Sequence, residues 1–344
     1  MHIGIMTCGG DCPGLNAAIR AVVLRATSRG VSVLGFEDGF EGLLEDRWIA
    51  LDRDRTAGIL PRGGSILGSS GANPFVDGAA TASALEVADR HRLTGLIVIG
   101  GNNSMATALA AQDAGIPVVG VPKTIDNDVE GTDTTIGYDT AVATATEAID
   151  RLTTTAESHD RVLIVETMGR DFGWIAVAAG MAGGADLVLP PEEPIRVERV
   201  IDLVKAQRQR GKRFSIIVVG EGALFEGEKT QTGRPQVGGG RFQLGGVGSR
   251  LAEKLAEQAG APWRITVSVI GHLQRGGSPS AADRILATRF GIRAADAAMD
   301  GPHGNMVAIS EGHIVLRPLT EVAGRLKPVN RDLLEAARAV FEQP

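Results

Sequence analysis

Residues 95–122 read GLIVIGGNNSMATALAAQDAGIPVVGVP, and this stretch predicts the fold class. Two short runs rich in Val, Ile and Gly, Gly95–Gly101 and Pro117–Pro122, are typical of buried strands. Ser104–Ala114, between them, reads as a helix. A helix that joins two apolar strands indicates a crossover between parallel neighbours. The stretch therefore predicts an α/β protein whose parallel sheet is covered on both faces.

The same alternation of strand and helix runs along the rest of the chain. His2–Thr7 predicts a strand, Leu15–Ser28 a helix, and residues 141–157 a long helix. Further strands are expected at Val31–Phe36, Val162–Met168, Asp186–Pro190, Ser215–Gly220 and Ile265–Ile270. Because 344 residues are too many for one ordinary hydrophobic core, we expect two doubly wound lobes with mainly parallel sheets.

Composition and charge exclude several classes of protein. The chain is 43% hydrophobic and 22% charged, which is typical of a folded globular protein. A net charge of -6 gives no reason to expect nucleic acid or a membrane surface as a partner. No apolar stretch approaches the roughly 20 residues of a spanning helix, and the N-terminus shows no secretory signal. Cys8 and Cys12 are the only cysteines, and we read them as reduced thiols of a cytoplasmic protein rather than as a redox or metal site.

Glycine-rich sequence follows the apolar strands, where parallel sheets usually bind ligands. Two such turns lead into helices, GGDCPGLN at 9–16 and GGNNS at 100–104. Their backbone N–H groups and helix N-termini suit an anion such as phosphate, although a plain tight turn is the alternative for each. The most loop-like segment is 224–247, which we expect to be a surface excursion that orders over a ligand.

A third cluster, PKTIDND at 122–128, carries the strongest chemical signal. Asp126 and Asp128, with Lys123 and Thr124 just upstream, are poor strand or helix material. They suit a general base beside a metal-binding or charge-orienting group, with the Lys and the Thr reaching phosphate oxygens. A solvated acidic turn is the alternative interpretation.

Three further motifs predict a socket for a phosphorylated acceptor. Arg170 emerges at a strand end in MGR, where a guanidinium can bind phosphate through two hydrogen bonds. His272 and Arg275 share the glycine-bracketed loop GHLQRGGS, and Glu221 in GEG supplies a carboxylate for sugar hydroxyls. Together with Asp126 as the base, these groups suggest in-line phosphoryl transfer, which needs positioning and electrostatics more than covalent chemistry.

The ordered set GGDCPGLN, RGGSILGSS, GGNNS, PKTIDND, MGR, GEG and HLQRGGSP resembles the phosphofructokinase family over nearly the whole chain. The resemblance implies two α/β lobes with the active site in the cleft between them, usually assembled as homotetramers or homodimers. It implies a larger phosphoryl-donor lobe at 1–138 and about 250–303, and a smaller sugar-phosphate lobe at 139–249 and about 304–344. It also implies Mg²⁺ as the cofactor, and fructose 6-phosphate with ATP or pyrophosphate as the substrates.

The resemblance also implies a role for each matching residue. Asp126 would be the general base, and the other catalytic residues would be Thr124, Asp128 and Arg170. The sugar phosphate would be held by Arg161, lent by a neighbouring subunit, and by Met168, Gly169, Glu221, Arg264, His272 and Arg275. The donor would be held by Gly10, Asp11, Gly71, Gly101, Asn102, Asn103, Ser104 and Lys123. The metal would be held weakly by Asn102, and by Asp126.

Three departures from the family pattern stand out. Asn102 replaces an acidic residue that helps hold magnesium, so we expect a weaker metal site. Gly71 replaces an arginine that in many members touches the transferring phosphate, which removes a charge-stabilising contact. The stretch before His272 is longer than usual, which argues against Arg264 as a second shared phosphate-binding arginine.

The altered donor side leaves several functions open. Lys123, and a residue bulkier than glycine at 103, resemble the pyrophosphate-using branch, but Lys123 also occurs in ATP-using relatives. The enzyme would alternatively transfer a phosphoryl or diphosphoryl group to a different ketose 6-phosphate in a specialised pathway. An alternative from another class of function is a weakly catalytic regulatory homologue that binds sugar phosphates. A nucleotide-cofactor oxidoreductase is disfavoured because residues 9–14 do not follow G-x-G-x-x-G.

Overall fold

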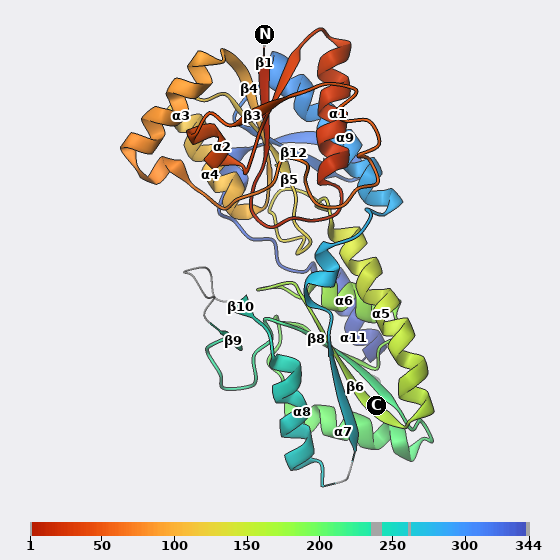
Figure 1. Cartoon of the computed structure of the whole chain (residues 1–344). Coiled ribbons are helices and arrows are strands. Elements are labelled where there is room, and N and C mark those ends of the chain that lie inside the picture. The colour runs from red at the N-terminus through yellow and green to blue at the C-terminus, as the bar shows by residue number, and fades with distance from the viewer. Residues whose placement is uncertain (1, 235–242, 261–262, 342–344) are drawn as a thin grey trace. The chain divides into compact units, whose positions relative to one another are not determined.

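The computed structural model describes residues 2–234, 243–260 and 263–341, and the chain in it divides into two compact units (Figure 1). Unit 1 comprises Met1–Thr140 and Arg275–Lys327, and unit 2 comprises Ala141–Gln274 and Pro328–Pro344. Each unit has a mainly parallel sheet with helices on both faces, which confirms the predicted α/β class. Every helix among the described residues is too short or too polar to span a bilayer.

Unit 1 is built on a seven-stranded sheet with the order β13-β12-β5-β4-β1-β2-β3. Its parallel strands are β1 (His2–Thr7), β2 (Ser32–Phe36), β4 (Leu93–Gly100), β5 (Val118–Pro122) and β12 (Asn305–Ser310). The antiparallel edges are β3 (Trp48–Leu51) and β13 (His313–Pro318). The first four parallel strands match predicted strands. The sequence interpretation missed β3, β12 and β13, of which β3 and β13 are partly exposed edge strands with short apolar runs of three or four residues.

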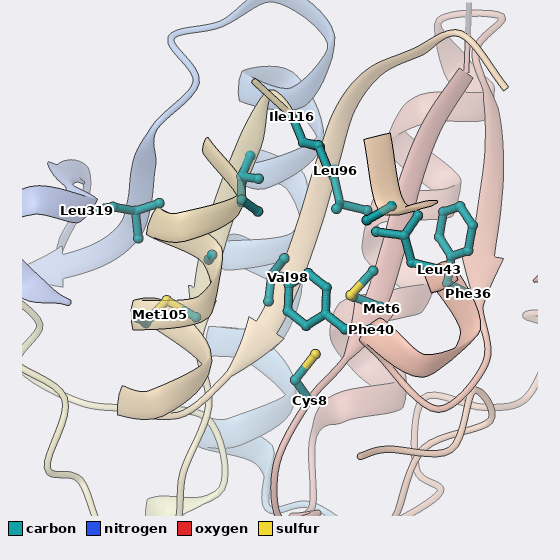
Figure 2. Close-up of a cluster of buried hydrophobic side chains, with 14 of the residues drawn as sticks. Met6, Cys8, Phe36, Phe40, Leu43, Leu96, Val98, Met105, Ile116 and Leu319 are labelled. Carbon is teal, nitrogen blue, oxygen red and sulfur yellow. The ribbon is translucent and has the colours of Figure 1, made fainter. Parts of the chain in front are cut away.

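Helices cover both faces of this sheet (Figure 1). α1 (Leu15–Ser28) packs with α9 (Ala281–Asp300) on one face. The other face carries α2 (Phe40–Leu44), the 3-10 helix η1 (Pro74–Val76), α3 (Gly78–Arg90), α4 (Asn102–Ala114) and α10 (Leu319–Val322). Figure 2 shows the buried cluster on that second face, which includes Met6, Cys8, Phe36, Phe40, Leu43, Leu96, Val98, Met105, Ile116 and Leu319.

Unit 2 is built on a four-stranded parallel sheet with the order β11-β6-β8-β7. The strands are β6 (Arg161–Thr167), β7 (Leu187–Leu189), β8 (Ser215–Gly220) and β11 (Arg264–Val269), and all four were predicted. α7 (Val197–Gln209) and α8 (Val247–Gln258) bury one face, and α6 (Trp174–Ala182) with α11 (Arg331–Phe341) covers the other (Figure 1). The long helix α5 (Tyr138–Ser158) begins in unit 1 and continues into unit 2.

The division of the chain differs from the predicted lobes in two segments. Residues 250–274 were expected in the larger lobe but belong to unit 2, because β11 pairs with β6 along its whole length. Residues 304–327 were expected in the smaller lobe but belong to unit 1, because β12 pairs with β5 and β13 with β12. β11 and β6, like β12 and β5, lie more than 100 residues apart in the sequence, and such pairings leave no periodic signal, so these memberships required the structure.

The predicted surface excursion at 224–247 is only partly described. Two short antiparallel strands, β9 (Gly233–Arg234) and β10 (Gln243–Leu244), lie within it. Residues 235–242 fall outside the described part of the chain. The expectation that this segment orders over a ligand therefore stays a prediction.

The buried cluster in Figure 2 predicts how much stability is lost when one of its aromatic side chains is truncated. Phe40 is 1% exposed and packs edge-to-face on Phe75 with ring centroids 5.6 Å apart. We expect Phe40→Ala to lower the free energy of unfolding by about 3–5 kcal/mol, because it removes buried apolar area and leaves a cavity. Urea denaturation measures this loss. Val76→Ala is the control, because Val76 is 82% exposed; equal losses in the two variants would contradict the prediction.

Candidate active site

Loops that are far apart in the sequence meet at the carboxyl ends of β1, β4 and β5 in unit 1. The loop after β1 contacts the loop at 65–71, because Gly9 N donates to Ser70 O over 2.8 Å and Ser69 Oγ donates to Gly9 O over 2.6 Å. The end of β5 is tied to the end of β4 through Lys123 N and Gly100 O, 2.9 Å apart. The parallel register of the three strands thus brings together the motifs GGDCPGLN, RGGSILGSS, GGNNS and PKTIDND.

Lys123 lies beneath these loops rather than in solvent. Only 2% of the residue is exposed, and its Nζ donates to Cys8 O over 2.9 Å and also to Gly10 O. Burial lowers the pKa of this ammonium. The observed contacts of Lys123 therefore hold the backbone of the predicted donor loop, and a direct contact with a phosphate oxygen stays a prediction.

The GGNNS motif opens helix α4. Gly101 is the N-cap and supplies no side chain, so the first-turn N–H groups keep their capacity to bind an anion. Gly100 allows the strand to approach the helix, because a Cβ there would lie 2.2 Å from the Cβ of Ser104. Asn103 is exposed, whereas the Oδ1 of Asn102 is buried and accepts no hydrogen bond from the described residues.

The PKTIDND loop is folded tightly around Asp126, which is only 5% exposed. Asp126 N donates to Thr124 Oγ1 over 3.1 Å, and Thr124 Oγ1 lies 3.3 Å from Asp126 Oδ2, to which it donates. Thr124 is held in turn by Thr135, whose hydroxyl donates to Thr124 O over 2.6 Å. The structure thus brings the predicted base and its predicted partner Thr124 into direct contact. Asp128 is half-buried at the end of the same loop.

Arg275 and Gly71, two of the predicted site residues, have different surroundings in unit 1. Arg275 Nη1 donates to Asp11 O over 3.2 Å, and a Cβ on Gly10 would lie 2.9 Å from that nitrogen. Arg275, which was predicted to hold the sugar phosphate, therefore lies over the donor loop of unit 1. Gly71 has open space instead, with no atom of the described residues within 4 Å of a Cβ built there.

In unit 2, the structure brings MGR and GEG together at the carboxyl ends of β6 and β8. Glu221 is 9% exposed, its N donates to Thr167 O over 2.9 Å, and its Oε1 accepts from Arg170 N over 3.3 Å. Gly169 and Arg170 both have positive φ angles, 140° and 52°. Met168 is 9% exposed. His272, in the 3-10 helix η2 (Gly271–Arg275), is exposed after the carboxyl end of β11.

Arg161 and Arg264 lie at the amino ends of their strands, opposite the end of the unit 2 sheet at which MGR and GEG lie. They are register partners at the amino ends of β6 and β11, and Arg161 Nη1 donates to Thr266 Oγ1 over 3.1 Å. Six residues of extended strand, about 20 Å, separate Arg161 from Thr167 at the other end of β6. One copy of the chain therefore does not bring these two arginines to the MGR and GEG loops.

Two buried polar residues had no role in the sequence interpretation. Asn16 fixes the RGGSILGSS loop, since its Nδ2 donates to Arg62 O and Gly63 O and its Oδ1 accepts from Ile66 N over 2.8 Å. Glu166, 1% exposed, accepts from Gly246 N over 2.8 Å and from Gly248 N over 2.7 Å at the start of α8. The only sequence signal for either was a polar side chain within an otherwise apolar strand or helix.

Parallel sheets with glycine-rich, helix-leading loops at their carboxyl ends define an α/β protein suited to phosphorylated ligands. The comparisons identify the family. The family model described as Phosphofructokinase matches residues 2–298. The chain is 47% identical over 345 residues to ATP-dependent 6-phosphofructokinase 2 of Streptomyces coelicolor, covering 99% of this chain and 100% of the relative. It is 48% identical, with the same coverage, to pyrophosphate–fructose 6-phosphate 1-phosphotransferase of Amycolatopsis methanolica.

Solved structures agree with this result. Phosphofructokinase of Pichia pastoris in the T-state superimposes with a TM-score of 0.83 and 29% identity, over 99% of this chain and 36% of that one. A pyrophosphate-dependent phosphofructokinase of Marinobacter aquaeolei has the same fold, with a TM-score of 0.84, 24% identity, and coverage of 99% of this chain and 90% of the other. The chain belongs to the phosphofructokinase family.

Gly222 provides a steric test of the junction between MGR and GEG. A Cβ at Gly222 would lie 1.7 Å from Arg170 O, so an alanine must displace the Arg170 backbone. We expect Gly222→Ala to lower the free energy of unfolding by about 3 kcal/mol, measured by thermal denaturation. Gly71→Ala, which meets open space, should leave stability unchanged. Equal melting temperatures for Gly222→Ala and the parent would show that the junction tolerates the extra methyl group.

Proposed function

We propose that this protein transfers the phosphoryl group of ATP or pyrophosphate to the 1-hydroxyl of fructose 6-phosphate. The observation that carries the proposal is the buried carboxylate of Asp126, held against Thr124 between loops suited to phosphate. The names of the two relatives at 47% and 48% identity support fructose 6-phosphate as the acceptor.

Asp126 is the general base in this proposal. Its carboxylate takes the proton of the acceptor hydroxyl as that oxygen attacks the transferring phosphorus. The hydroxyl of Thr124, 3.3 Å from Oδ2, orients the carboxylate and completes the tight turn. Asp128 and Arg170 act on the same reaction, the first by orienting charge and the second by neutralising it on the phosphoryl group.

Unit 2 supplies the residues that we propose bind the sugar phosphate. Glu221 accepts a hydrogen bond from Arg170 N, so the carboxylate that receives sugar hydroxyls also fixes the arginine loop. Met168, Gly169 and His272 complete this set from one copy. Because Arg161 and Arg264 lie at the far edge of the sheet, their proposed contact with a sugar phosphate is with the site of another copy, in a homodimer or homotetramer.

Unit 1 supplies the proposed donor site. Gly10, Asp11 and the first turn of α4 at 101–104 offer backbone N–H groups, and Lys123 holds this backbone in place from below. The two similar relatives use different donors by name, so identity does not choose between ATP and pyrophosphate. We also propose a cytoplasmic location, which suits two unpaired thiols, Cys8 and Cys12.

Magnesium fits this site as a weakly held ion. Asn102 Oδ1 is a buried acceptor to which no described residue donates, and Asp126 supplies a carboxylate. The described residues contain no cluster of three or more His, Cys, Asp or Glu side chains that would hold a metal without substrate. Mg²⁺ typically takes few protein ligands and keeps water and substrate phosphates. Asn102 and Asp126 would hold it together with the donor, where it neutralises phosphate charge.

Phosphorus NMR tests the reaction and the donor together. Purified protein is incubated with Mg²⁺ and fructose 6-phosphate, in parallel with ATP and with pyrophosphate. A bisphosphate signal with either donor supports the proposal and identifies the donor. The absence of product with both donors would overturn it in favour of another ketose 6-phosphate, a diphosphoryl transfer or a regulatory homologue, and an isomeric sugar phosphate would be tried next.

Asp126→Asn tests the assigned base. We expect turnover to fall by about 10²–10⁴-fold while binding of fructose 6-phosphate persists, because the amide keeps the shape of the carboxylate but takes up no proton. Initial rates and isothermal titration calorimetry measure the two effects. Asp113→Asn, at an exposed position of α4, is the matched control and should leave the rate unchanged. A rate for Asp126→Asn equal to that of the parent would exclude Asp126 as the base.

Asn102→Asp tests the metal ligand. We expect this variant to reach half-maximal activity at a lower free Mg²⁺ concentration than the parent, because a carboxylate replaces a neutral carbonyl oxygen. Titration of activity against free Mg²⁺ measures the requirement. Asn103→Asp adds the same charge one residue later, at an exposed side chain, and serves as the control. An equal shift in both variants would mean that general charge, rather than ligation by residue 102, sets the requirement.

A further inference from the structure

Lys327, the last residue of unit 1, bonds the loop that carries Asp126. Its Nζ donates to Asn127 Oδ1 over 3.2 Å, to Thr132 O over 2.8 Å and to Asp133 O over 2.9 Å. These acceptors belong to residues 127–133, nearly 200 positions earlier in the sequence. The ammonium thus joins the residue after Asp126 to the return arm of the same loop.

Backbone contacts fix Lys327 to this loop as well. Lys327 N donates to Asp128 O over 2.9 Å, and Leu326 forms an antiparallel bridge with Val129. The segment at 326–327 therefore runs along residues 128–129 as a short extra strand. Both the main chain and the side chain of Lys327 hold the loop.

Asn127 connects Lys327 to the segment that contains the proposed base. It is 1% exposed and has a φ of 53°, a left-handed conformation that asparagine tolerates better than most residues. Its Oδ1 also accepts from Thr135 N over 3.1 Å, and the Thr135 hydroxyl donates to Thr124 O over 2.6 Å. Asp126 lies between the two anchored residues, Thr124 and Asn127.

We propose that Lys327 is a positioning residue for phosphoryl transfer, which orients the Asp126 carboxylate through Asn127 without touching substrate. The inference rests on the proposed function, in which Asp126 is the base. A carboxylate displaced by about 1 Å from a productive geometry costs up to 10²-fold in rate, so the restraint should be visible in turnover.

The charge of Lys327 makes the restraint sensitive to pH. Burial lowers its pKa to about 8, against the opposing effect of Asp133, Glu130 and Asp128. The hollow beside it, about 490 Å³, is also lined by the charged residues Arg317, Glu321 and Arg325. Above pH 8 the neutral amine has two N–H groups for the three acceptors, so the loop loses a hydrogen bond.

The loop loses a hydrogen bond above pH 8, but the contribution of Lys327 to the free energy of unfolding should rise over the same pH range. Between pH 8 and the ordinary lysine pKa of 10.5, the unfolded chain binds the proton that folded Lys327 has lost. The free energy of unfolding therefore gains a contribution that increases with pH in this window. A rate that declines in the same window is then not explained by unfolding.

The test compares Lys327→Met, Lys327→Arg and Arg325→Met. Arg325 lines the same hollow and is exposed, so its variant removes one positive charge without touching the loop contacts. With fructose 6-phosphate and the donor that supports turnover, we expect Lys327→Met to lower kcat by about 10–10²-fold with KM changed less than about twofold. Lys327→Arg should keep a larger share of kcat and lose the decline near pH 8. Arg325→Met should behave as the parent.

Two outcomes would overturn the proposal: an unchanged kcat in Lys327→Met, or an equal loss in Arg325→Met. If Lys327→Met does not fold, Thr135→Val interrupts the same series of bonds at the hydroxyl that holds Thr124. It should lower kcat with KM unchanged, and an unchanged kcat would overturn the proposal.

Hydrogen exchange separates this proposal from the proposed activity. The peptide that contains residues 124–128 should exchange faster in Lys327→Met than in Arg325→Met, whether or not either donor is used. Equal exchange would overturn the role of Lys327 even in an active enzyme. Faster exchange in a protein without turnover would leave the restraint in place and overturn only the proposed reaction.

Discussion

The hydrogen bonds of the buried Lys123 ammonium are the interaction on which the proposed donor side of unit 1 depends. From the end of β5 the ammonium donates to Cys8 O and Gly10 O, while the backbone N–H of Lys123 donates to Gly100 O at the end of β4. One residue therefore ties together the ends of three parallel strands. Carbonyl groups at strand ends otherwise face water, and an almost fully buried lysine persists only where such acceptors replace that water.

The loop at 123–135 is held by two lysines, one at its start and one that reaches its middle. Lys123 fixes its start to the loop after β1, and Lys327 fixes its middle through Asn127 and two carbonyl groups. In these bonds the two ammonium groups donate to backbone carbonyl oxygens and to the side-chain amide oxygen of Asn127, so the restraint acts on the backbone of the loop and on Asn127. Such bonds fix the segment that contains the proposed base Asp126, which suits a reaction that depends on positioning.

Much of this site follows from the sequence, because parallel strands align their carboxyl ends. β4 and β5 were predicted as parallel neighbours and β1 as a further strand, and ligand-binding motifs were expected at the carboxyl ends of such strands; the structure adds that β1 pairs with β4. The sequence contained no comparable signal for Lys327, which follows a partly exposed edge strand and a short helix, or for the pairing of β12 with β5. Arg275 is the opposite case: it was recognised as functional beside His272, but only packing showed that its guanidinium lies on Asp11 O.

The position of Arg275 changes the interpretation of the unusual donor side. Asn102 is neutral and Gly71 has no side chain, so two charges expected from the family pattern are missing. The structure has two positive charges at the same loop, the Arg275 guanidinium over Gly10 and the Lys123 ammonium beneath it. Two basic side chains therefore contact the loop that we propose binds the donor. Basic groups held beside a proposed phosphate site would stabilise charge that develops there, so the substituted loop is compatible with the proposed catalysis.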